Sequence, residues 1–198
     1  MSNHSGWDKR YSNPDFIYGT EPNKYLCNTL KNLKPGSLLL PGEGEGRNAL
    51  WAAKHGWDVT AFDSSSVAQQ KALNLFKQHS VNVSYLITDI QNLTLSEQFN
   101  AIGMVFVHLE RSMFAQAAKK LTGLLKPNGH LIIEMFNQNQ LHLNSGGPKN
   151  PNFFVTPREL KTMFNSLTII ELKNEEVYLD EGPLHQGKAM VIRMHAVK

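Results

Sequence analysis

Three glycines alternate with other residues in the segment Leu40-Pro41-Gly42-Glu43-Gly44-Glu45-Gly46. Glycines at this spacing let the backbone turn tightly from a strand into a helix, and they let a ligand lie against bare main chain. The first turn of the helix that follows has free N–H groups and the positive end of the helix dipole, which suit a carboxylate or a phosphate. A glycine cluster alone is also typical of an ordinary turn, so other residues near the loop must indicate whether it binds a ligand.

The position of Asp63 relative to this loop indicates what the loop binds. It ends the next predicted strand and lies 63 − 44 = 19 residues after Gly44. A carboxylate at that place can accept hydrogen bonds from both hydroxyls of a ribose. The strand, the glycine loop, the helix and the acidic residue together predict a site for a cofactor of the nucleoside type.

The glycine spacing alone leaves the type of cofactor open. The dinucleotide pattern G-x-G-x-x-G/A fails from Gly42, where its third position is Arg47, but it is allowed from Gly44, where that position is Ala49. A nicotinamide cofactor is therefore not excluded by the loop. The sequence lacks the Tyr-x-x-x-Lys pair or second substrate domain expected of such a reductase. An NAD(P)-binding oxidoreductase and a non-catalytic cofactor-binding module remain as alternatives.

Further polar residues follow two other predicted strands. Thr88-Asp89-Ile90 comes after one, and Val107-His108-Leu109 after the next. An imidazole titrates near neutral pH, so His108 is a candidate general base, with a packing or cofactor-contacting histidine as the alternative. The remaining histidines are dispersed with no pair at metal-ligand spacing, so we expect no metal site.

These residues need a scaffold, and the chain predicts one by alternating strands and helices. We expect a single domain over residues 1–198, an α/β fold with a doubly wound, mostly parallel sheet of seven strands and helices on both faces. No helix separates the last two strands, so they form a C-terminal antiparallel hairpin. In such sheets ligands bind at the carboxyl ends of the parallel strands. The predicted strands are 37–40, 58–62, 81–87, 100–107, 130–136, 167–178 and 187–197.

Composition excludes several classes of protein. The 198 residues carry a formal charge of +3 without a basic arm, so we expect no nucleic-acid partner. The single cysteine, Cys27, excludes an intrachain disulfide and fits a reducing compartment. The apolar run from Ala101 to Val107 is too short to cross a membrane, and the N-terminus lacks the apolar core of a secretory signal. We therefore expect a cytoplasmic protein, a monomer or a homodimer, that acts on a small molecule.

The G-x-G-x-G spacing of Gly42, Gly44 and Gly46 resembles the first motif of the class I S-adenosylmethionine-dependent methyltransferases. The turn Leu125-Lys126-Pro127-Asn128-Gly129 and the seven-stranded sheet with its hairpin resemble that superfamily too. The segments Trp7-Asp8-Lys9-Arg10-Tyr11 and Tyr18-Gly19-Thr20-Glu21-Pro22 look like the opening of its small tellurite-resistance and thiopurine-type members. The sequence departs at Leu40, where many members have an acidic residue; Glu43, Glu45 or an N-terminal residue are candidates to replace it.

The resemblance implies S-adenosylmethionine as the cofactor and methyl transfer by in-line displacement to a thiol, a chalcogen oxyanion or a heterocycle. It implies that residues 1–34 form a helical lid and that loops 137–155 and 179–186 wall the acceptor pocket. Asp89 would bind the adenine amino group, and Ile90 would pack on the ring. The full set of expected cofactor-binding residues is Trp7, Arg10, Tyr11, Tyr18, Gly42, Glu43, Gly44, Gly46, Arg47, Asn48, Asp63, Ser64, Asp89, Ile90 and Val107, with His108 as the expected catalytic residue.

Overall fold

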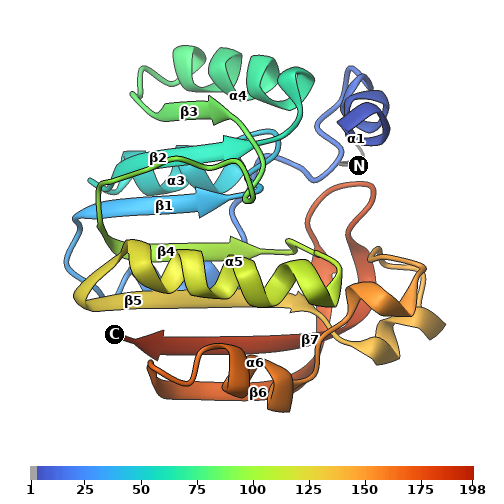
Figure 1. Ribbon diagram of the computed structural model, residues 1–198. Helices are drawn as coiled ribbons and strands as arrows, with labels where there is room; N and C mark the ends of the chain where they lie inside the picture. Colours follow the sequence, from blue (N-terminus) through green and yellow to red (C-terminus); the bar gives the residue numbers. More distant parts are fainter. Residues whose placement is uncertain (1–3) are drawn as a thin grey trace.

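The computed structural model describes residues 4–198 (Figure 1). Its helices and strands alternate through most of the chain, as the sequence predicts. In chain order they are α1 His4–Tyr11, α2 Lys24–Leu30, β1 Ser37–Pro41, α3 Arg47–Lys54, β2 Asp58–Asp63, α4 Ser66–Gln78, β3 Ser84–Ile87, β4 Phe99–Val105, α5 Arg111–Leu124, β5 Leu125–Phe136, the 3₁₀ helices η1 Gln138–His142 and η2 Pro151–Phe153, α6 Pro157–Met163, β6 Thr168–Asp180 and β7 Gln186–Val197.

The strands form one sheet in the order β3-β2-β1-β4-β5-β7-β6. The first five strands are parallel, β7 is antiparallel to β5, and β6 is antiparallel to β7. This confirms the predicted mixed sheet with its C-terminal hairpin. Strand order reverses between β1 and β4, which is where ligands bind in sheets of this type.

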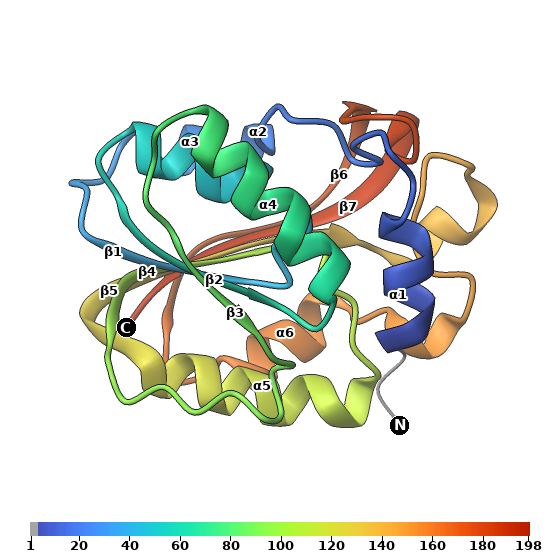
Figure 2. The same ribbon diagram turned by 90° about the horizontal axis from the view of Figure 1, so that it is seen from above.

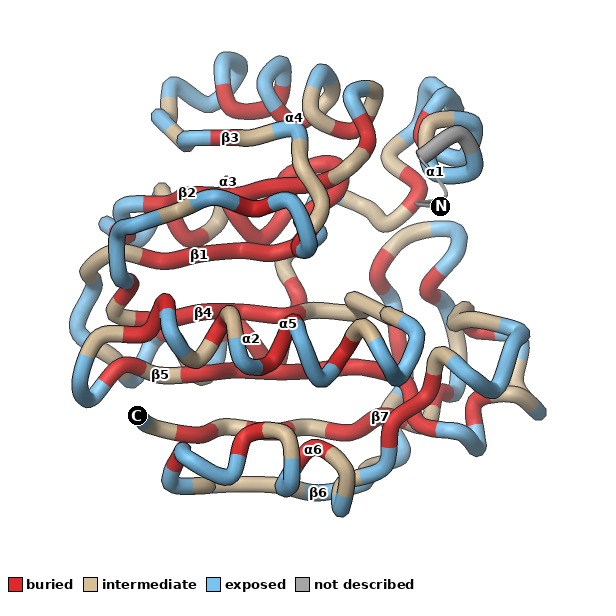
Figure 3. Tube along the Cα trace, in the orientation of Figure 1, coloured by how far each residue is buried: buried red, intermediate tan, exposed pale blue. Residues whose placement is uncertain are grey.

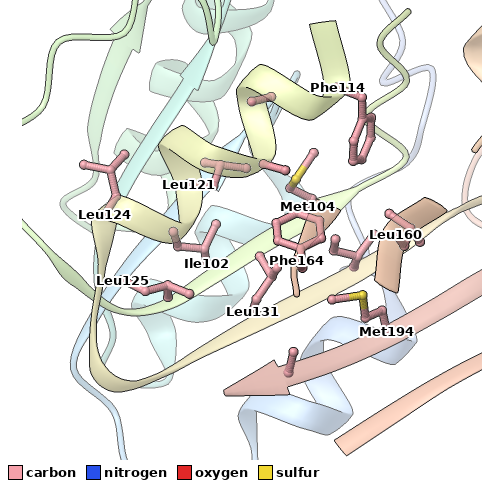
Figure 4. Packing of buried hydrophobic residues seen from close by; sticks show 14 of the residues in the cluster. Ile102, Met104, Phe114, Leu121, Leu124, Leu125, Leu131, Leu160, Phe164 and Met194 are labelled. Carbon is pink, nitrogen blue, oxygen red and sulfur yellow. The ribbon is translucent and has the colours of Figure 1, made fainter. Parts of the chain in front are cut away.

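Helices cover both faces of the sheet (Figure 2). One face carries α2, α3 and α4, whose apolar side chains share a core with Leu38, Leu40 and Val59 of the central strands. The other face carries α5 and α6, where Phe114 and Phe164 pack on Met104 (Figure 4). Buried segments run along the middle strands, and exposure concentrates on the outer sides of the helices and along β6 (Figure 3). Strands buried on both faces explain the nearly continuous apolar runs in the sequence.

Local polar residues set the helix starts. The Ser65 hydroxyl accepts a hydrogen bond from the Ala68 N–H at the start of α4, and Asn23 caps α2 in the same way. A capping box between Thr156 and Glu159 starts α6.

The N-terminal segment divides into two parts with different roles. Helix α1 lies next to α4 near the carboxyl ends of the strands, on the right in Figure 1. Helix α2 instead buries Tyr25, Leu26 and Leu30 against the sheet, so it is part of the core. Residues 24–30 of the lid predicted over residues 1–34 are therefore part of the core, and the first three residues of that range lie outside the described part.

The turn predicted at residues 126–129 lies inside a strand. Strand β5 begins at Leu125, and the irregular pairing between Phe99 and Ala101 on β4 accommodates the bend. Asn128 takes a left-handed φ of 61° there. Within residues 4–198, no helix has the length and apolar character needed to cross a membrane.

Candidate functional site: the glycine loop and its surroundings

The glycine loop after β1 is clamped through both backbone groups of Gly44. The Gly44 N–H donates to Oδ2 of Asp63 at 3.1 Å, and the Tyr85 hydroxyl donates to the Gly44 carbonyl at 2.6 Å. Gly42, Gly44 and Gly46 have φ values of 60°, 63° and 92°. These left-handed conformations explain the glycines. These two hydrogen bonds hold the loop at the carboxyl ends of β1 and β2.

Side chains cover this loop, so the expectation of bare main chain is not met. A Cβ atom added to Gly44 would lie 2.7 Å from the Tyr11 hydroxyl, and one added to Gly42 would lie 2.9 Å from Cγ2 of Val107. The glycines therefore also serve close approach by two of the predicted site residues. A ligand lying along Gly44 would have to displace Tyr11 of α1.

Asp63 is buried at the end of β2, as predicted. Its Oδ1 accepts from the Ser65 N–H at 2.9 Å, and its Oδ2 accepts from Gly44. Burial raises the pKa of Asp63, although the hydrogen bonds from Ser65 and Gly44 oppose that rise. A carboxylate oxygen has two lone pairs, so both oxygens keep capacity for a further donor. Ser64 follows directly and is half-buried.

Glu43 and Asn48 hold the loop together. Glu43 accepts from the Ala49 N–H at 2.7 Å and from Asn48 Nδ2 at 3.2 Å, at the start of α3. Asn48 Oδ1 accepts from the Asn23 N–H at 2.9 Å. Burial raises the pKa of Glu43 to about 7, against the lowering effect of these hydrogen bonds. Both side chains are engaged within the protein.

Glu45 is engaged as well. Its Oε2 accepts from the Ile17 N–H at 2.9 Å, and its carboxylate pairs with Lys71 of α4. The Lys71 ammonium also donates to the carbonyls of Asn13 and Asp15, which ties the N-terminal segment to α4. The two carboxylates that were candidates to replace an acidic residue at position 40 thus hold the scaffold. Leu40 itself is in the core.

Arg47 enters a buried charge network that the sequence does not reveal. Its guanidinium donates to Glu181 at 2.7 Å. The Asn23 amide donates to Glu181 at 3.0 Å and to Glu134 at 2.6 Å, and Arg193 donates to Glu134 at 2.5 Å. These groups come from five parts of the chain. They join the N-terminal segment, the start of α3, β5, β7 and the loop between β6 and β7.

Burial acts to raise the pKa of both glutamates in this network, and their partners oppose it. The pKa of Glu134 is raised in spite of Arg193. The pKa of Glu181 is lowered, because His185 and Arg47 outweigh its burial. Glu181 is therefore a buried carboxylate held ionised by its partners.

The predicted lid residues lie together in the structure. Trp7 stacks on Tyr11 at a centroid distance of 5.6 Å, and the Arg10 guanidinium lies 4.8 Å from the Trp7 ring. Arg10 also donates to the Tyr18 hydroxyl at 3.1 Å. The Ser65 hydroxyl donates to Asp8 at 2.5 Å, which links α1 to the end of β2. Trp7 is 38% exposed, whereas Tyr11 is buried.

Asp89 lies in the turn after β3, and Ile90 lies in the hydrophobic core. Asp89 Oδ1 accepts from the N–H groups of Gln91 and Asn92, so the side chain holds the turn after β3. Ile90 is buried in the same core cluster as Phe62 and Leu93.

His108, the predicted catalytic residue, is half-buried and contacts backbone groups through both ring nitrogens. Its Nδ1 lies 3.3 Å from the Phe153 carbonyl, and its Nε2 accepts from the Phe136 N–H at 3.4 Å. Burial lowers its pKa to about 4. The ring stacks on Phe136 at 5.7 Å. A neutral imidazole with both nitrogens occupied by backbone supports the packing interpretation.

His185 lies in the loop between β6 and β7, where it is buried among aromatic rings. Its ring centroid lies 4.5 Å from those of Tyr18 and Phe106 and 5.3 Å from that of Phe136. Its Nδ1 is buried without a hydrogen-bond partner among the described residues and lies 3.9 Å from Glu181. Burial lowers the pKa of His185, although Glu181 opposes this.

Phe106, directly after β4, was missed by the sequence analysis. Its φ of 52° is an uncommon left-handed conformation for a bulky residue, which marks strain at the edge of the sheet. Its ring stacks on Phe136 at 4.6 Å. The only sequence signal is its place at the end of a predicted strand.

The two loops expected to wall an acceptor pocket do meet. A Cβ atom on Gly146 would lie 2.7 Å from Cδ2 of His185, so loop 137–155 touches loop 179–186. A pocket of about 180 Å³ is lined by residues at both ends of loop 137–155, among them Asn137 and Phe154, and by Arg111 and Asn174. Within residues 4–198, no three His, Cys, Asp or Glu side chains are arranged to hold a metal ion.

Comparison with known proteins agrees with this geometry. Residues 39–129, from β1 through the glycine loop to the start of β5, match the family "Methyltransferase domain". No curated protein matches the chain.

Solved structures share the fold. TehB from Haemophilus influenzae is 20% identical, with a TM-score of 0.74 over 98% of this chain and 66% of its own. The N-methyltransferase NodS from Bradyrhizobium japonicum WM9, in complex with S-adenosyl-L-homocysteine, is 16% identical, with a TM-score of 0.75 over 100% of this chain and 99% of its own. A structure from the conversion of a disulfide bond into a thioacetal group during echinomycin biosynthesis is 16% identical, with a TM-score of 0.80 over 98% of this chain and 91% of its own.

The glycine loop that joins β1 to α3 lies within residues 39–129, the part of the chain that matches the methyltransferase-domain family, and the seven-stranded sheet has the fold of solved methyltransferases such as NodS.

Proposed function

We propose that the chain transfers a methyl group from S-adenosylmethionine to a small-molecule acceptor: a thiol, a chalcogen oxyanion or a heterocycle. The observation that carries this proposal is the clamp on Gly44 by Asp63 and Tyr85. It fixes a turn of left-handed glycines beside a buried carboxylate where strand order reverses.

The residues at this edge fit the cofactor. Asp63 has free lone pairs for the ribose hydroxyls, and Ser64 lies next to it. Glu43, Arg47 and Asn48 support the loop beside the proposed cofactor through their buried contacts. Asp89 and Ile90 shape the turn after β3, which lies beside Asp63, because Ile87 pairs with Asp63 across the two strands.

The N-terminal segment is the proposed cover of the bound cofactor. The side chains of Trp7, Arg10, Tyr11 and Tyr18 form one connected cluster over the loop. Tyr11 packs on Gly44, so cofactor entry requires α1 to move and closure brings it back. Such a lid excludes water from the reacting atoms.

S-adenosylmethionine supplies an electrophilic methyl group on a sulfonium, so the protein mainly has to align an acceptor with it. Alignment alone contributes about 7–11 kcal/mol in favourable cases. Loops 137–155 and 179–186 are the proposed walls for the acceptor, with His185, Phe106 and Tyr18 as an aromatic lining. An acceptor that arrives as an anion needs no general base, which agrees with the backbone contacts of His108.

Ligand-dependent thermal unfolding tests the cofactor assignment. Because a ligand that binds only the folded state stabilises it, we expect S-adenosylhomocysteine to raise Tm and NAD(P) to leave Tm unchanged. The reverse pattern would eliminate the proposal in favour of an oxidoreductase.

The acceptor class is tested separately by offering thiols, selenite and tellurite, and heterocyclic amines with S-adenosylmethionine, and by measuring release of S-adenosylhomocysteine. We expect turnover with at least one class. Cofactor binding with no turnover on any of them would refute the acceptor assignment alone.

A further inference from the structure

His185 lies where several segments of the proposed acceptor site meet. Its ring packs on Tyr18 of the N-terminal segment, on Phe106 after β4 and on Phe136 at the end of β5. A Cβ atom on Gly146, in the loop after β5, would lie 2.7 Å from Cδ2 and 3.1 Å from Nε2 of the same ring. Figure 1 shows the β6–β7 loop, in red, reaching toward α1.

The ring nitrogens of His185 have no hydrogen-bond partner among the described residues. The residue is 5% exposed, and its Nδ1 is buried 3.9 Å from Glu181. Its Nε2 faces Gly146 and makes no hydrogen bond in the described part of the chain. A buried polar group without a partner costs free energy, so its presence here indicates a role other than packing. The nitrogens of His108, by contrast, both contact backbone.

A buried carboxylate lies behind this ring. Arg47 donates to Oε2 of Glu181 at 2.7 Å, and Asn23 donates to its Oε1 at 3.0 Å. Burial acts to raise the pKa of Glu181, but His185 and Arg47 lower it, so the group is ionised. An ionised carboxylate beside Nδ1 favours the tautomer with its proton on Nδ1, and it stabilises an imidazolium. The separation of 3.9 Å can shorten on binding, because such hydrogen bonds are often long before the substrate is present.

We propose that His185 is the general base of this site for a thiol that arrives protonated, and that Glu181 positions its ring. The inference rests on the proposed function. Nε2 takes the thiol proton, so the S–H bond breaks, an N–H bond forms and the sulfur keeps the electron pair. That pair forms the bond to the methyl carbon, while the electron pair of the broken bond stays on the sulfonium sulfur of the cofactor. The imidazolium then releases its proton to water.

The charges around His185 leave it neutral near pH 7, as a base must be. Burial lowers the pKa of His185, Glu181 opposes this, and two nearby guanidinium groups act in the same direction as burial. The charged and titratable groups near the ring are Glu181, Arg47, Arg10, Tyr18 and His108.

Access to His185 is linked to the proposed lid. Tyr18 packs on the ring at a centroid distance of 4.5 Å, and its hydroxyl accepts from Arg10 of α1 at 3.1 Å. The movement of α1 that cofactor entry requires would release the side chain of Tyr18 from Arg10 and open a path to the ring.

Two thiols that differ in acidity test the role of His185. At pH 7.5, 2-mercaptoethanol is protonated, whereas thiophenol is largely ionised and needs no base. We expect His185→Gln to lower kcat with 2-mercaptoethanol at least about 100-fold and kcat with thiophenol less than about threefold, because a general base acts only on the thiol that still carries its proton. A merely structural role would lower both rates alike, and equal losses would overturn the proposal.

Release of S-adenosylhomocysteine measures both rates. His195→Gln is the matched control, because His195 is another half-buried histidine, bonded to His130 of β5, and its replacement should keep both rates. An unchanged Kd for S-adenosylhomocysteine shows that His185→Gln is folded. If the wild type turns over neither thiol, the proposal is overturned, while binding of S-adenosylhomocysteine would leave the cofactor part of the proposed function standing.

The tautomer of His185 tests its positioning without turnover. In the protein saturated with S-adenosylhomocysteine at pH 7.5, nitrogen-15 spectra of the histidine rings, assigned by the signal lost in His185→Gln, should show a neutral ring with its proton on Nδ1. In Glu181→Gln this preference should fall, because the charge that favours it is gone. A wild-type ring that is charged, or that carries its proton on Nε2, would overturn the proposal.

Discussion

Asp63 is the residue on which the site depends most directly. Its carboxylate holds the glycine loop through Gly44 and still has lone pairs for ribose hydroxyls. Glu43, directly before the clamped Gly44, is buried and bonded to the start of α3. We propose that the two carboxylates differ in role: Asp63 binds the ligand and Glu43 supports the loop.

Replacing Asp63 by Asn should weaken cofactor binding. The amide keeps one acceptor oxygen but loses the charge and half of the acceptor capacity. We expect the Kd for S-adenosylhomocysteine, measured by isothermal titration calorimetry, to rise at least about tenfold, or about 1.4 kcal/mol. Asp58→Asn, at the exposed start of the same strand, is the control and should bind normally. An unchanged Kd in Asp63→Asn would refute its role.

The free energy of unfolding of Glu43→Gln relative to the wild type should depend on pH, because Glu43 is a buried titrating carboxyl group. The folded pKa of about 7 lies above the ordinary 4.5, so folding favours the protonated form. Stability from this group is present below pH 4.5 and is lost as pH rises to about 7. The variant cannot ionise, so its free energy of unfolding relative to wild type should increase over that range, by at most about 3 kcal/mol. Urea unfolding at pH 5 and pH 8 measures it, and an equal difference at both would contradict the burial of a titrating Glu43.

His108→Gln should leave turnover and its pH profile between pH 6 and 8 unchanged. With a pKa of about 4, His108 is neutral over that range, and backbone groups occupy both nitrogens. Steady-state rates per folded enzyme are the measurement. Loss of turnover together with loss of a limb of the pH profile would restore His108 as a general base.

At the scale of elements, the N-terminal segment and the β6–β7 loop are in close backbone contact at Gly19 and Gly182. A Cβ atom on Gly182 would lie 2.2 Å from the Gly19 nitrogen and 2.5 Å from the Tyr18 carbonyl carbon. The Leu184 N–H donates to the Ile17 carbonyl beside this contact, and Glu181 binds Arg47 below it. The proposed lid and the proposed acceptor wall therefore depend on each other.

Gly182→Ala should separate these two elements. The added methyl group meets backbone, which cannot yield as a side chain does, so we expect stability to fall by about 1–3 kcal/mol more than in the control and cofactor affinity to drop. Gly187→Ala is the matched control: its φ of 105° is also left-handed, but its Cβ would meet only Ser145 at 4.0 Å. Thermal unfolding and S-adenosylhomocysteine titration compare the two, and equal losses in both would contradict the contact.

Some secondary-structure elements could be predicted from the sequence, and the packing of others could not. The strands and the glycine loop follow from short apolar runs and from residue spacing, which are local properties. The role of α2 did not follow, because whether Tyr25, Leu26 and Leu30 face a ligand or the sheet depends on tertiary packing. The Asn23–Glu134–Glu181 network could not be predicted, because its bonds join residues 111 and 158 positions apart.

At the scale of the whole molecule, the sheet brings the ends of β1, β2, β4 and β5 and the β6–β7 loop to one edge. Glu181 of that loop belongs to the buried network with Arg47 and Asn23, and α1 lies at the same edge of the sheet (Figure 2). Removing one partner from a buried ion pair is strongly destabilising. The network thus holds the β6–β7 loop and the start of α3 together at the proposed site.

A structure of the complex with S-adenosylhomocysteine would show directly whether the glycine loop and Asp63 bind the cofactor. We predict that the ligand lies along residues 42–46, with its ribose hydroxyls on Asp63 and with Tyr11 displaced from Gly44 to close over it. A ligand bound away from the glycine loop, or a complex in which Tyr11 still rests on Gly44 and Asp63 touches no part of the ligand, would contradict it.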